Sequence, residues 1–131
     1  MDTKKIMIID DDSDDRFFFR DALSKMQCAI ECMEASGGKE ALVLLNTEAQ
    51  LPNFIFLDIN MPRMDGRDCL KQLKGDQKLQ NIPVIVYSTY FSEESVNEFQ
   101  KLGALSYLNK PTDIKKLPGH ILDAIGGQWV V

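Results

Sequence analysis

The 131-residue sequence contains few of the residue types that mark metal-binding and disulfide-rich proteins. It has one histidine, His120, and three cysteines, an odd number with neither a CxxC spacing nor a histidine partner. A structural zinc site needs several such ligands at close spacing, and a disulfide framework needs paired cysteines. We therefore expect all three cysteines to be reduced residues that pack in the interior.

Basic residues and long apolar segments are also scarce. There are 15 lysines and arginines against 20 acids, and the net charge of −5 argues against a nucleic-acid-binding surface, which needs clustered basic side chains. No run approaches the roughly 20 apolar residues that span a bilayer. The first residues lead into acids rather than a signal-peptide cleavage site. The sequence therefore predicts a soluble, cytoplasmic protein with no nucleic-acid or membrane partner.

Apolar runs alternate with amphipathic segments along the chain, and no linker or repeat interrupts them. Continuous apolar runs predict buried strands at 5–10, 54–58 and 83–88, and weaker patterns predict strands at 29–35 and 105–109. Helical spacing fills the intervals. The alternation predicts a single α/β domain over residues 1–131. Its core is a flavodoxin-like, doubly wound, five-stranded parallel sheet of order 2-1-3-4-5 with helices on both faces.

The first and last helices depend on a few residues at their starts. Ser13 is expected to cap the first helix, in which Asp14 and Asp15 act as first-turn acids favoured by the helix dipole. Pro118 leaves two alternatives for the last helix, a start near Leu117 or a kink, because proline inside a helix costs ~3 kcal/mol. The buried stripe of the first helix is expected to hold Phe18, Ala22 and Met26.

Polar side chains follow the predicted strands at the edge where a doubly wound sheet binds ligands. The first strand ends in three acids at 10–12, the third in Asp58, the fourth in Ser88, and the fifth in Lys110. Two carboxylates about 5 Å apart repel by about 3 kcal/mol at an effective dielectric constant near 20, so such a crevice calls for a cation. Mg²⁺ suits oxygen ligands and accepts phosphate oxygens in its shell. The set therefore predicts phosphoryl transfer to a carboxylate.

The arrangement closely resembles the receiver domain of two-component response regulators, in its stand-alone, chemotaxis-regulator-like form. Four segments carry the resemblance: residues 8–12 at the first strand end, 56–66 from the third strand through Met-Pro-Arg-Met-Asp-Gly, the strand at 83–88, and residues 103–111. Each segment alone is common, but the four occur together in the family's order and spacing. The resemblance covers essentially the whole chain and leaves no separate output domain.

The resemblance implies a role for each acid. Asp58 would be the phosphoacceptor, becoming 4-aspartylphosphate by taking a phosphoryl group from a phosphohistidine of a sensor histidine kinase or phosphotransfer protein. Asp11 and Asp58 would bind Mg²⁺ directly with the backbone carbonyl of Asn60, and Asp10 would hold a metal-bound water. Such a protein is a signalling module that catalyses only its own phosphorylation and dephosphorylation.

The resemblance also assigns the residues around the phosphoryl group. Ser88 would bind a phosphate oxygen and report its arrival, and Lys110 would pair with the phosphate. Pro111 would follow through a cis peptide bond, and Gly66 would permit a tight turn under the site. Tyr107 stands at the position of the aromatic switch, whose ring turns inward on activation.

Output is expected to pass through protein contacts. The family uses the surface of its fourth helix, fifth strand and fifth helix to bind a downstream protein target. Thr89 stands where the family commonly has a small residue, and Tyr90 stands where its members vary. With Asn60, both are expected to tune the phosphoryl lifetime. The sequence leaves open the cognate kinase, the target, and whether phosphorylation drives dimerisation.

An alternative of another class is a phosphatase of the haloacid dehalogenase type. That family also uses a strand-end Asp-x-Asp, a later Ser or Thr and a lysine, and Asp10 would then be the nucleophile. This reading leaves Asp58 and the Met-Pro-Arg-Met-Asp-Gly segment without a purpose, and the chain has no cap domain. A phosphoacceptor module is therefore the preferred interpretation.

Overall fold

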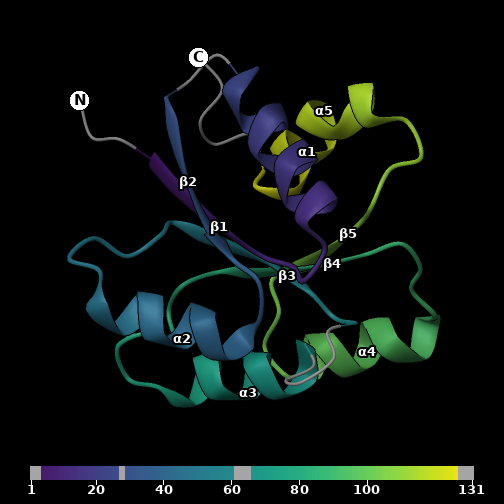
Figure 1. The fold of residues 1–131 in the computed structure, drawn as a ribbon. Coiled ribbons are helices and arrows are strands. Elements are labelled where there is room, and N and C mark those ends of the chain that lie inside the picture. Colours follow the sequence, from purple (N-terminus) through teal and green to yellow (C-terminus); the bar gives the residue numbers. More distant parts are fainter. Residues whose placement is uncertain (1–3, 27–28, 61–65, 127–131) are drawn as a thin grey trace.

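The computed structural model describes residues 4–26, 29–60 and 66–126, which form one sheet with helices on both faces (Figure 1). The strands are all parallel and lie in the order β2-β1-β3-β4-β5, as the sequence predicts. Their bounds agree with the predicted ranges to within one residue: β1 Lys4–Ile9, β2 Ile30–Ala35, β3 Phe54–Asp58, β4 Val84–Ser88 and β5 Ser106–Asn109.

The helices divide between the two faces of the sheet. In Figure 1, α1 and α5 cover one face, and α2, α3 and α4 cover the other. Their bounds are α1 Ser13–Ser24, α2 Gly38–Thr47, α3 Gly66–Gly75, α4 Glu93–Lys101 and α5 Leu117–Ala124, with a 3₁₀ turn, η1, at Ile114–Lys116.

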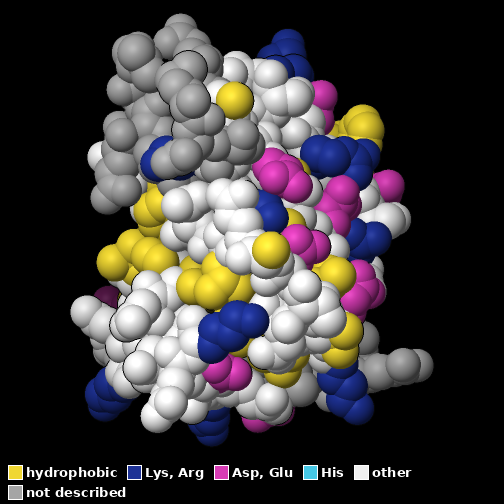
Figure 2. Space-filling view, turned by 90° about the vertical axis from the view of Figure 1, so that its left-hand side faces the viewer, with side chains coloured by type: hydrophobic (Ala, Val, Ile, Leu, Met, Phe, Trp, Pro, Cys, Tyr) yellow, Lys and Arg dark blue, Asp and Glu magenta, His cyan; other side chains and the backbone are white. Residues whose placement is uncertain are grey.

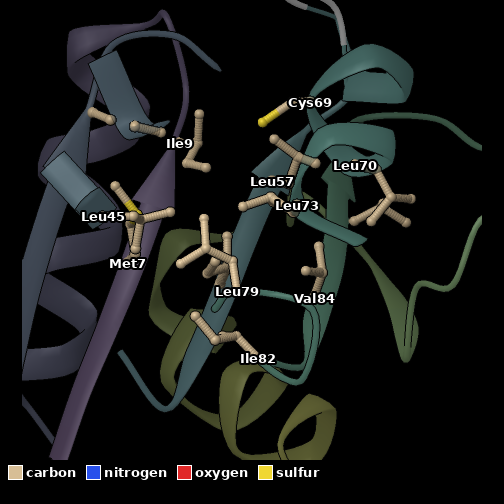
Figure 3. Close-up of a cluster of buried hydrophobic side chains, with 14 of the residues drawn as sticks. Met7, Ile9, Leu45, Leu57, Cys69, Leu70, Leu73, Leu79, Ile82 and Val84 are labelled. Carbon is tan, nitrogen blue, oxygen red and sulfur yellow. The ribbon is translucent and has the colours of Figure 1, made fainter. Parts of the chain in front are cut away.

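Two apolar cores follow from this layering, because successive side chains of a strand point to opposite faces. Met7 and Ile9 of β1 belong to the core on the side of α2 and α3, which also holds Leu45, Leu70 and Leu73 (Figure 3). Ile6 and Ile8 enter the second core, which includes Phe19 of α1 and Ile121 of α5. Each fully buried side chain of this size stabilises the fold by about 1.5–3 kcal/mol. The cores therefore hold the strand ends in a fixed register.

Helix α1 differs from its prediction at its start and in its buried face. The N-cap is Asp12, whose Oδ1 accepts hydrogen bonds from the backbone N–H of Asp14 at 2.8 Å and of Asp15 at 3.3 Å. Ser13 is instead the first helical residue, so the expectation that it caps the helix is wrong. The fully buried side chains are Phe19, Ala22 and Leu23, because the face of α1 turned to the sheet follows the i, i+3, i+4 spacing from Phe19; Phe18 and Met26 lie at the margin of that face and are half-buried.

The other helix starts agree with expectation. Ser92 caps α4, and its hydroxyl accepts a hydrogen bond from the backbone N–H of Ser95 at 3.1 Å. Helix α5 begins at Leu117, the first of the two alternatives, so Pro118 lies in the first turn, where its missing N–H costs nothing. Gly103 closes α4 with a φ of +104°, which favours glycine.

Acidic and basic side chains are mixed on the face of the molecule shown in Figure 2. On that face, Lys and Arg side chains lie beside Asp and Glu side chains rather than gathering into a patch of one sign. Within the described ranges, no helix has both the length and the apolarity needed to cross a membrane. Cys32 and Cys69 are free thiols, and Cys28 lies outside the described residues.

Candidate functional site

The carboxyl ends of the central strands bring the predicted site residues together. Asp58 and Ser88 are the last residues of β3 and β4, and Asp10 directly follows β1. Lys110 follows β5, where its backbone N–H donates to the carbonyl of Ser88 at 2.7 Å. Asp10, Asp58 and Ser88 are buried to 4% exposure or less, so the polar groups lie in a crevice rather than on an open surface.

Three carboxylates form a cluster suited to a cation. Asp10, Asp11 and Asp58 each place one oxygen within 4.8 Å of the others. Asp11 is exposed, and the other two are buried. Hard oxygen ligands at one strand edge fit Mg²⁺, which keeps several waters and takes few protein carboxylates. The residues present therefore fit a divalent cation, with the exposed Asp11 at its solvent side.

Each buried carboxylate has one oxygen held by the backbone. Oδ1 of Asp10 accepts a hydrogen bond from the N–H of Asp12 at 3.0 Å, and Oδ1 of Asp58 accepts one from the N–H of Asn60 at 3.1 Å. The second oxygens face Lys110, whose Nζ lies 2.8 Å from Asp10 Oδ2 and 3.8 Å from Asp58 Oδ2. The carboxyl groups are thus fixed in orientation before any ligand arrives.

Asp58 is the acid whose ionisation is most perturbed by these surroundings. Burial raises its pKa to about 6, the N–H of Asn60 opposes this change, and the negative charge of Asp10 adds to it. Lys110 partly offsets the rise. Because burial makes the charged form of Asp58 unfavourable, a cation beside the carboxylate would stabilise that form, which agrees with the ligand set.

Lys110 is the positive charge of the crevice. Burial opposes its charge, but hydrogen bonds to Asp10 and Asp15 and the nearby negative charges outweigh that effect and raise its pKa. Nζ also lies 5.3 Å from the centre of the Tyr87 ring, a distance that favours a cation. The side chain is 12% exposed, so the charge is held in place and is present throughout the physiological range.

Asp15 is a member of this group that the sequence interpretation missed. Its Oδ2 accepts a hydrogen bond from Lys110 Nζ at 2.8 Å, although the two residues are 95 positions apart. The sequence assigns Asp15 only to the dipole of α1, together with Asp14, which is exposed. Recognising Asp12 as the cap would have placed Asp15 on the third helical position, close to the end of β1.

Ser88 lies where the chain leaves β4. Its hydroxyl donates to the carbonyl of Tyr90 at 3.2 Å and lies 3.4 Å from Nδ2 of Asn60, which donates to it. The side chains of Thr89 and Tyr90 are exposed, with Tyr90 at 74%. The Ser88 hydroxyl is therefore linked to the loop that leads to α4, and its hydrogen bonds bind that loop to the strand end.

Tyr107 lies outward on β5, at 49% exposure. Its ring packs against Phe91, with the ring centres 5.1 Å apart and the planes at 55°. A cavity of 350 Å³ lies beside it between α4 and β5, lined by Val96, Phe99 and Leu105 among others. Because Tyr107 itself lines this cavity, its ring has space to change position.

Gly66 and Pro111 are the two residues expected to shape the backbone here. A Cβ at Gly66 would lie 2.5 Å from the Cα of Ile59, a close backbone approach that requires glycine. The tight turn expected at this glycine stays a prediction, because the residues before it lie outside the described ranges. The expected cis bond before Pro111 is wrong, because the described residues contain no cis peptide. The trans form is the one X–Pro bonds favour, by about 0.5–1 kcal/mol. Residues 61–65, which include most of the Met-Pro-Arg-Met-Asp-Gly segment, lie outside the described ranges.

Comparison with known families decides what this arrangement is. The family described as the response regulator receiver domain matches residues 6–122, which include the site and nearly all of the sheet. This chain belongs to the response regulator receiver family. As a receiver domain, it is a phosphoacceptor signalling switch of two-component systems rather than a metabolic enzyme. Receiver domains act with kinases and phosphotransfer proteins.

Three relatives of this receiver domain match it over nine-tenths or more of their own length. The sporulation initiation phosphotransferase F of Bacillus subtilis is 32% identical over 117 residues, 89% of this chain and 90% of that protein. The phosphorylated cyanobacterial phytochrome response regulator RcpA is 31% identical, with a TM-score of 0.85 over 98% of this chain and 94% of its own. The Mn²⁺-bound response regulator Rcp1 is 26% identical, with a TM-score of 0.82 over 98% of this chain and 97% of its own.

Proposed function

We propose that this receiver domain takes a phosphoryl group onto the side chain of Asp58 from a phosphohistidine of a sensor histidine kinase or phosphotransfer protein. The observation that carries the proposal is the position of Asp58, which ends the central strand β3 between two further acids and one lysine. In the transfer, a carboxylate oxygen forms the new bond to phosphorus as the bond from phosphorus to the imidazole nitrogen breaks. The electron pair of that bond stays on the imidazole, which takes up a proton.

Mg²⁺ is the cation that this chemistry calls for. Asp11 and Asp58 would bind it directly together with the backbone carbonyl of Asn60, and Asp10 would hold one of its waters. When bound, the ion offsets the negative charge that the carboxylates and the phosphoryl group share. Rcp1, a relative with the same fold, was solved with Mn²⁺ bound, which supports a divalent ion in this family.

Side chains of the protein are placed to bind the phosphoryl oxygens that the metal ion does not. Lys110 presents a fixed ammonium 3.8 Å from Asp58 Oδ2, close enough to pair with an oxygen of a phosphoryl group carried there. The Ser88 hydroxyl can turn from the Tyr90 carbonyl to that group. We expect Thr89, Tyr90 and Asn60 to flank the approach to Asp58 and to set how fast water removes the phosphoryl group.

The change that partner proteins detect would also depend on the Ser88 hydroxyl. If Ser88 leaves the carbonyl of Tyr90, the loop between β4 and α4 loses one of its ties to the strand end. Phe91, in that loop, contacts the ring of Tyr107. We expect this change to alter the surface formed by α4, β5 and α5, which would bind a downstream protein or a second phosphorylated copy. We further propose that residues 1–131 form one receiver domain, with output through this surface.

The phosphatase alternative is not favoured. The family assignment gives the chain a receiver fold, and in it Asp10 is fully buried with Oδ1 bound by the N–H of Asp12 and Oδ2 paired with Lys110. A nucleophile engaged on both oxygens is poorly placed to attack. Asp58 is the remaining buried carboxylate of the cluster and has a looser contact with Lys110.

Intact mass measurement tests the proposal. Wild type and Asp58→Asn are incubated with a small acyl phosphate, with Mg²⁺ or with EDTA. We expect one phosphoryl adduct on wild type that needs Mg²⁺ and is absent from the variant. An adduct on both proteins, or turnover of phosphomonoesters, would move the chemistry to Asp10. Gel filtration of the adduct then shows whether phosphorylation produces a dimer.

A further inference from the structure

Lys110 has more partners than a lysine reserved for phosphate needs. Its Nζ lies 2.8 Å from Asp10 Oδ2 and 2.8 Å from Asp15 Oδ2, but 3.8 Å from Asp58 Oδ2. Nζ donates a hydrogen bond to Asp15 and forms an ion pair with Asp10, so both of its short contacts are with carboxylates other than the phosphoacceptor. We propose that Asp15 is a positioning residue that competes with the phosphoryl group for Lys110 and so limits phosphoryl uptake. The proposal rests on the function proposed above.

Asp15 is held against Lys110 by the start of α1. Its backbone N–H donates to the capping carboxylate of Asp12 at 3.3 Å, which fixes the first turn of the helix. The next residue, Arg16, donates from its guanidinium to the carbonyl of Asp10 at 2.7 Å. The carboxylate of Asp15 thus has a defined place beside the site although its side chain is 34% exposed.

The contact has two opposite effects on phosphoryl binding. The contact with Asp15 orients the ammonium of Lys110, which favours phosphoryl binding. It also occupies one ammonium proton and adds a negative charge near the phosphoryl position, which disfavours phosphoryl binding. Asp10 alone can supply the orientation, because its fully buried Oδ2 contacts Nζ at the same 2.8 Å. Asp15 therefore adds little order that Asp10 does not already give. The competition and the added charge remain, so the net effect of Asp15 is to oppose the phosphoryl group.

The same charge acts in the other direction on a metal ion. A carboxylate beside the cluster of Asp10, Asp11 and Asp58 makes the crevice more negative, and its hold on Lys110 moderates the lysine's repulsion of a cation. Loss of Asp15 is therefore expected to weaken Mg²⁺ binding while it strengthens binding of a phosphoryl group. Damage to the fold would weaken both, so the opposite signs separate the proposal from a structural role.

The test compares Asp15→Asn with Asp14→Asn. Both variants remove one charge from the first turn of α1, but Asp14 is exposed, and the described contacts show no bond from its side chain to Lys110. Calorimetry measures Mg²⁺ affinity in the absence of phosphoryl analogue, and a beryllofluoride titration at saturating Mg²⁺ measures the affinity for the analogue. We expect Asp15→Asn to bind beryllofluoride about tenfold more tightly and Mg²⁺ about threefold less tightly, because one charge is removed near both ligands.

Two control variants separate a specific role of Asp15 from a general effect of charge or folding. Asp14→Asn should change either affinity by less than about twofold, since an exposed charge is screened by salt. Asp15→Glu, which restores the charge, should return both affinities toward wild type. A fall of both affinities in Asp15→Asn, weaker beryllofluoride binding, or equal changes in the two Asn variants would overturn the role of Asp15. If wild type binds neither Mg²⁺ nor beryllofluoride, the proposed function fails as well, and that result is distinct from wild-type binding with an unaffected Asp15→Asn.

Discussion

Gly66→Ala is predicted to damage both stability and the site, because Gly66 packs directly beneath the phosphoacceptor. An added Cβ would lie 2.5 Å from the Cα of Ile59 and 3.1 Å from the carbonyl oxygen of Asp58. Both atoms belong to the backbone, so no side-chain rotation relieves the contact. Overpacking of this kind costs typically about 1–3 kcal/mol. Since alanine is favoured over glycine in a helix by at most about 1 kcal/mol, we expect a net loss of roughly 1–2 kcal/mol.

Gly119→Ala provides a matched control for this prediction. Gly119 also lies near the start of a helix, α5, and a Cβ there has no heavy atom within 4 Å. Its substitution should leave stability unchanged or raise it by up to about 1 kcal/mol. Urea denaturation gives the free energy of unfolding of each variant, and calorimetry gives its Mg²⁺ affinity. If Gly66→Ala is as stable as Gly119→Ala and binds Mg²⁺ like wild type, the close approach of Gly66 to Ile59 does not constrain this position.

Three further predictions concern the site and the core. In EDTA, burial holds the pKa of Asp58 at about 6 against an ordinary 3.8, so the folded protein binds the proton more tightly and stability falls as pH rises through this interval. Asp58→Asn should remove that fall and raise the urea midpoint at pH 7.5, and an unchanged pH profile would contradict it. Ser88→Ala should still form the phosphoryl adduct but lose the ring change at Tyr107, which NMR of tyrosine-labelled protein detects; a normal response would exclude Ser88 as the link. The thiol of Cys69, fully buried with a pKa raised by burial to about 12, should resist iodoacetamide at pH 8 until urea is added, and rapid native alkylation would show that its core opens.

Strand positions were predictable because burial on both faces produces short continuous apolar runs. Phe54–Asp58 is such a run and matches its predicted range, and the polar residues that follow the central strands meet at one edge as expected. The edge strand β2 has mixed exposure, and its pattern is correspondingly weaker in the sequence. The sheet and the residues at its carboxyl edge therefore follow from local patterns plus the rules of parallel topology.

Contacts between distant segments were not predictable in the same way. The pairing of Asp15 with Lys110 depends on which side of α1 faces the end of β5, and helical spacing in the sequence does not by itself decide that. For the same reason Phe19, and not the expected Phe18, is the fully buried phenylalanine of α1. The trans bond before Pro111 also differs from expectation, because that expectation came from the family and not from the residues around it. Local sequence thus specifies elements better than it specifies how their faces meet.

The position of the phosphoryl group tests the central claim most directly. After reaction with an acyl phosphate and Mg²⁺, borohydride converts the aspartyl phosphate to a stable alcohol, and trypsin then separates the two candidate acids. Asp10 lies in the peptide 6–16, and Asp58 is the one aspartate in the peptide 40–63. We expect the reduced residue at Asp58 in the peptide 40–63. Reduction at Asp10 in the peptide 6–16 would contradict it.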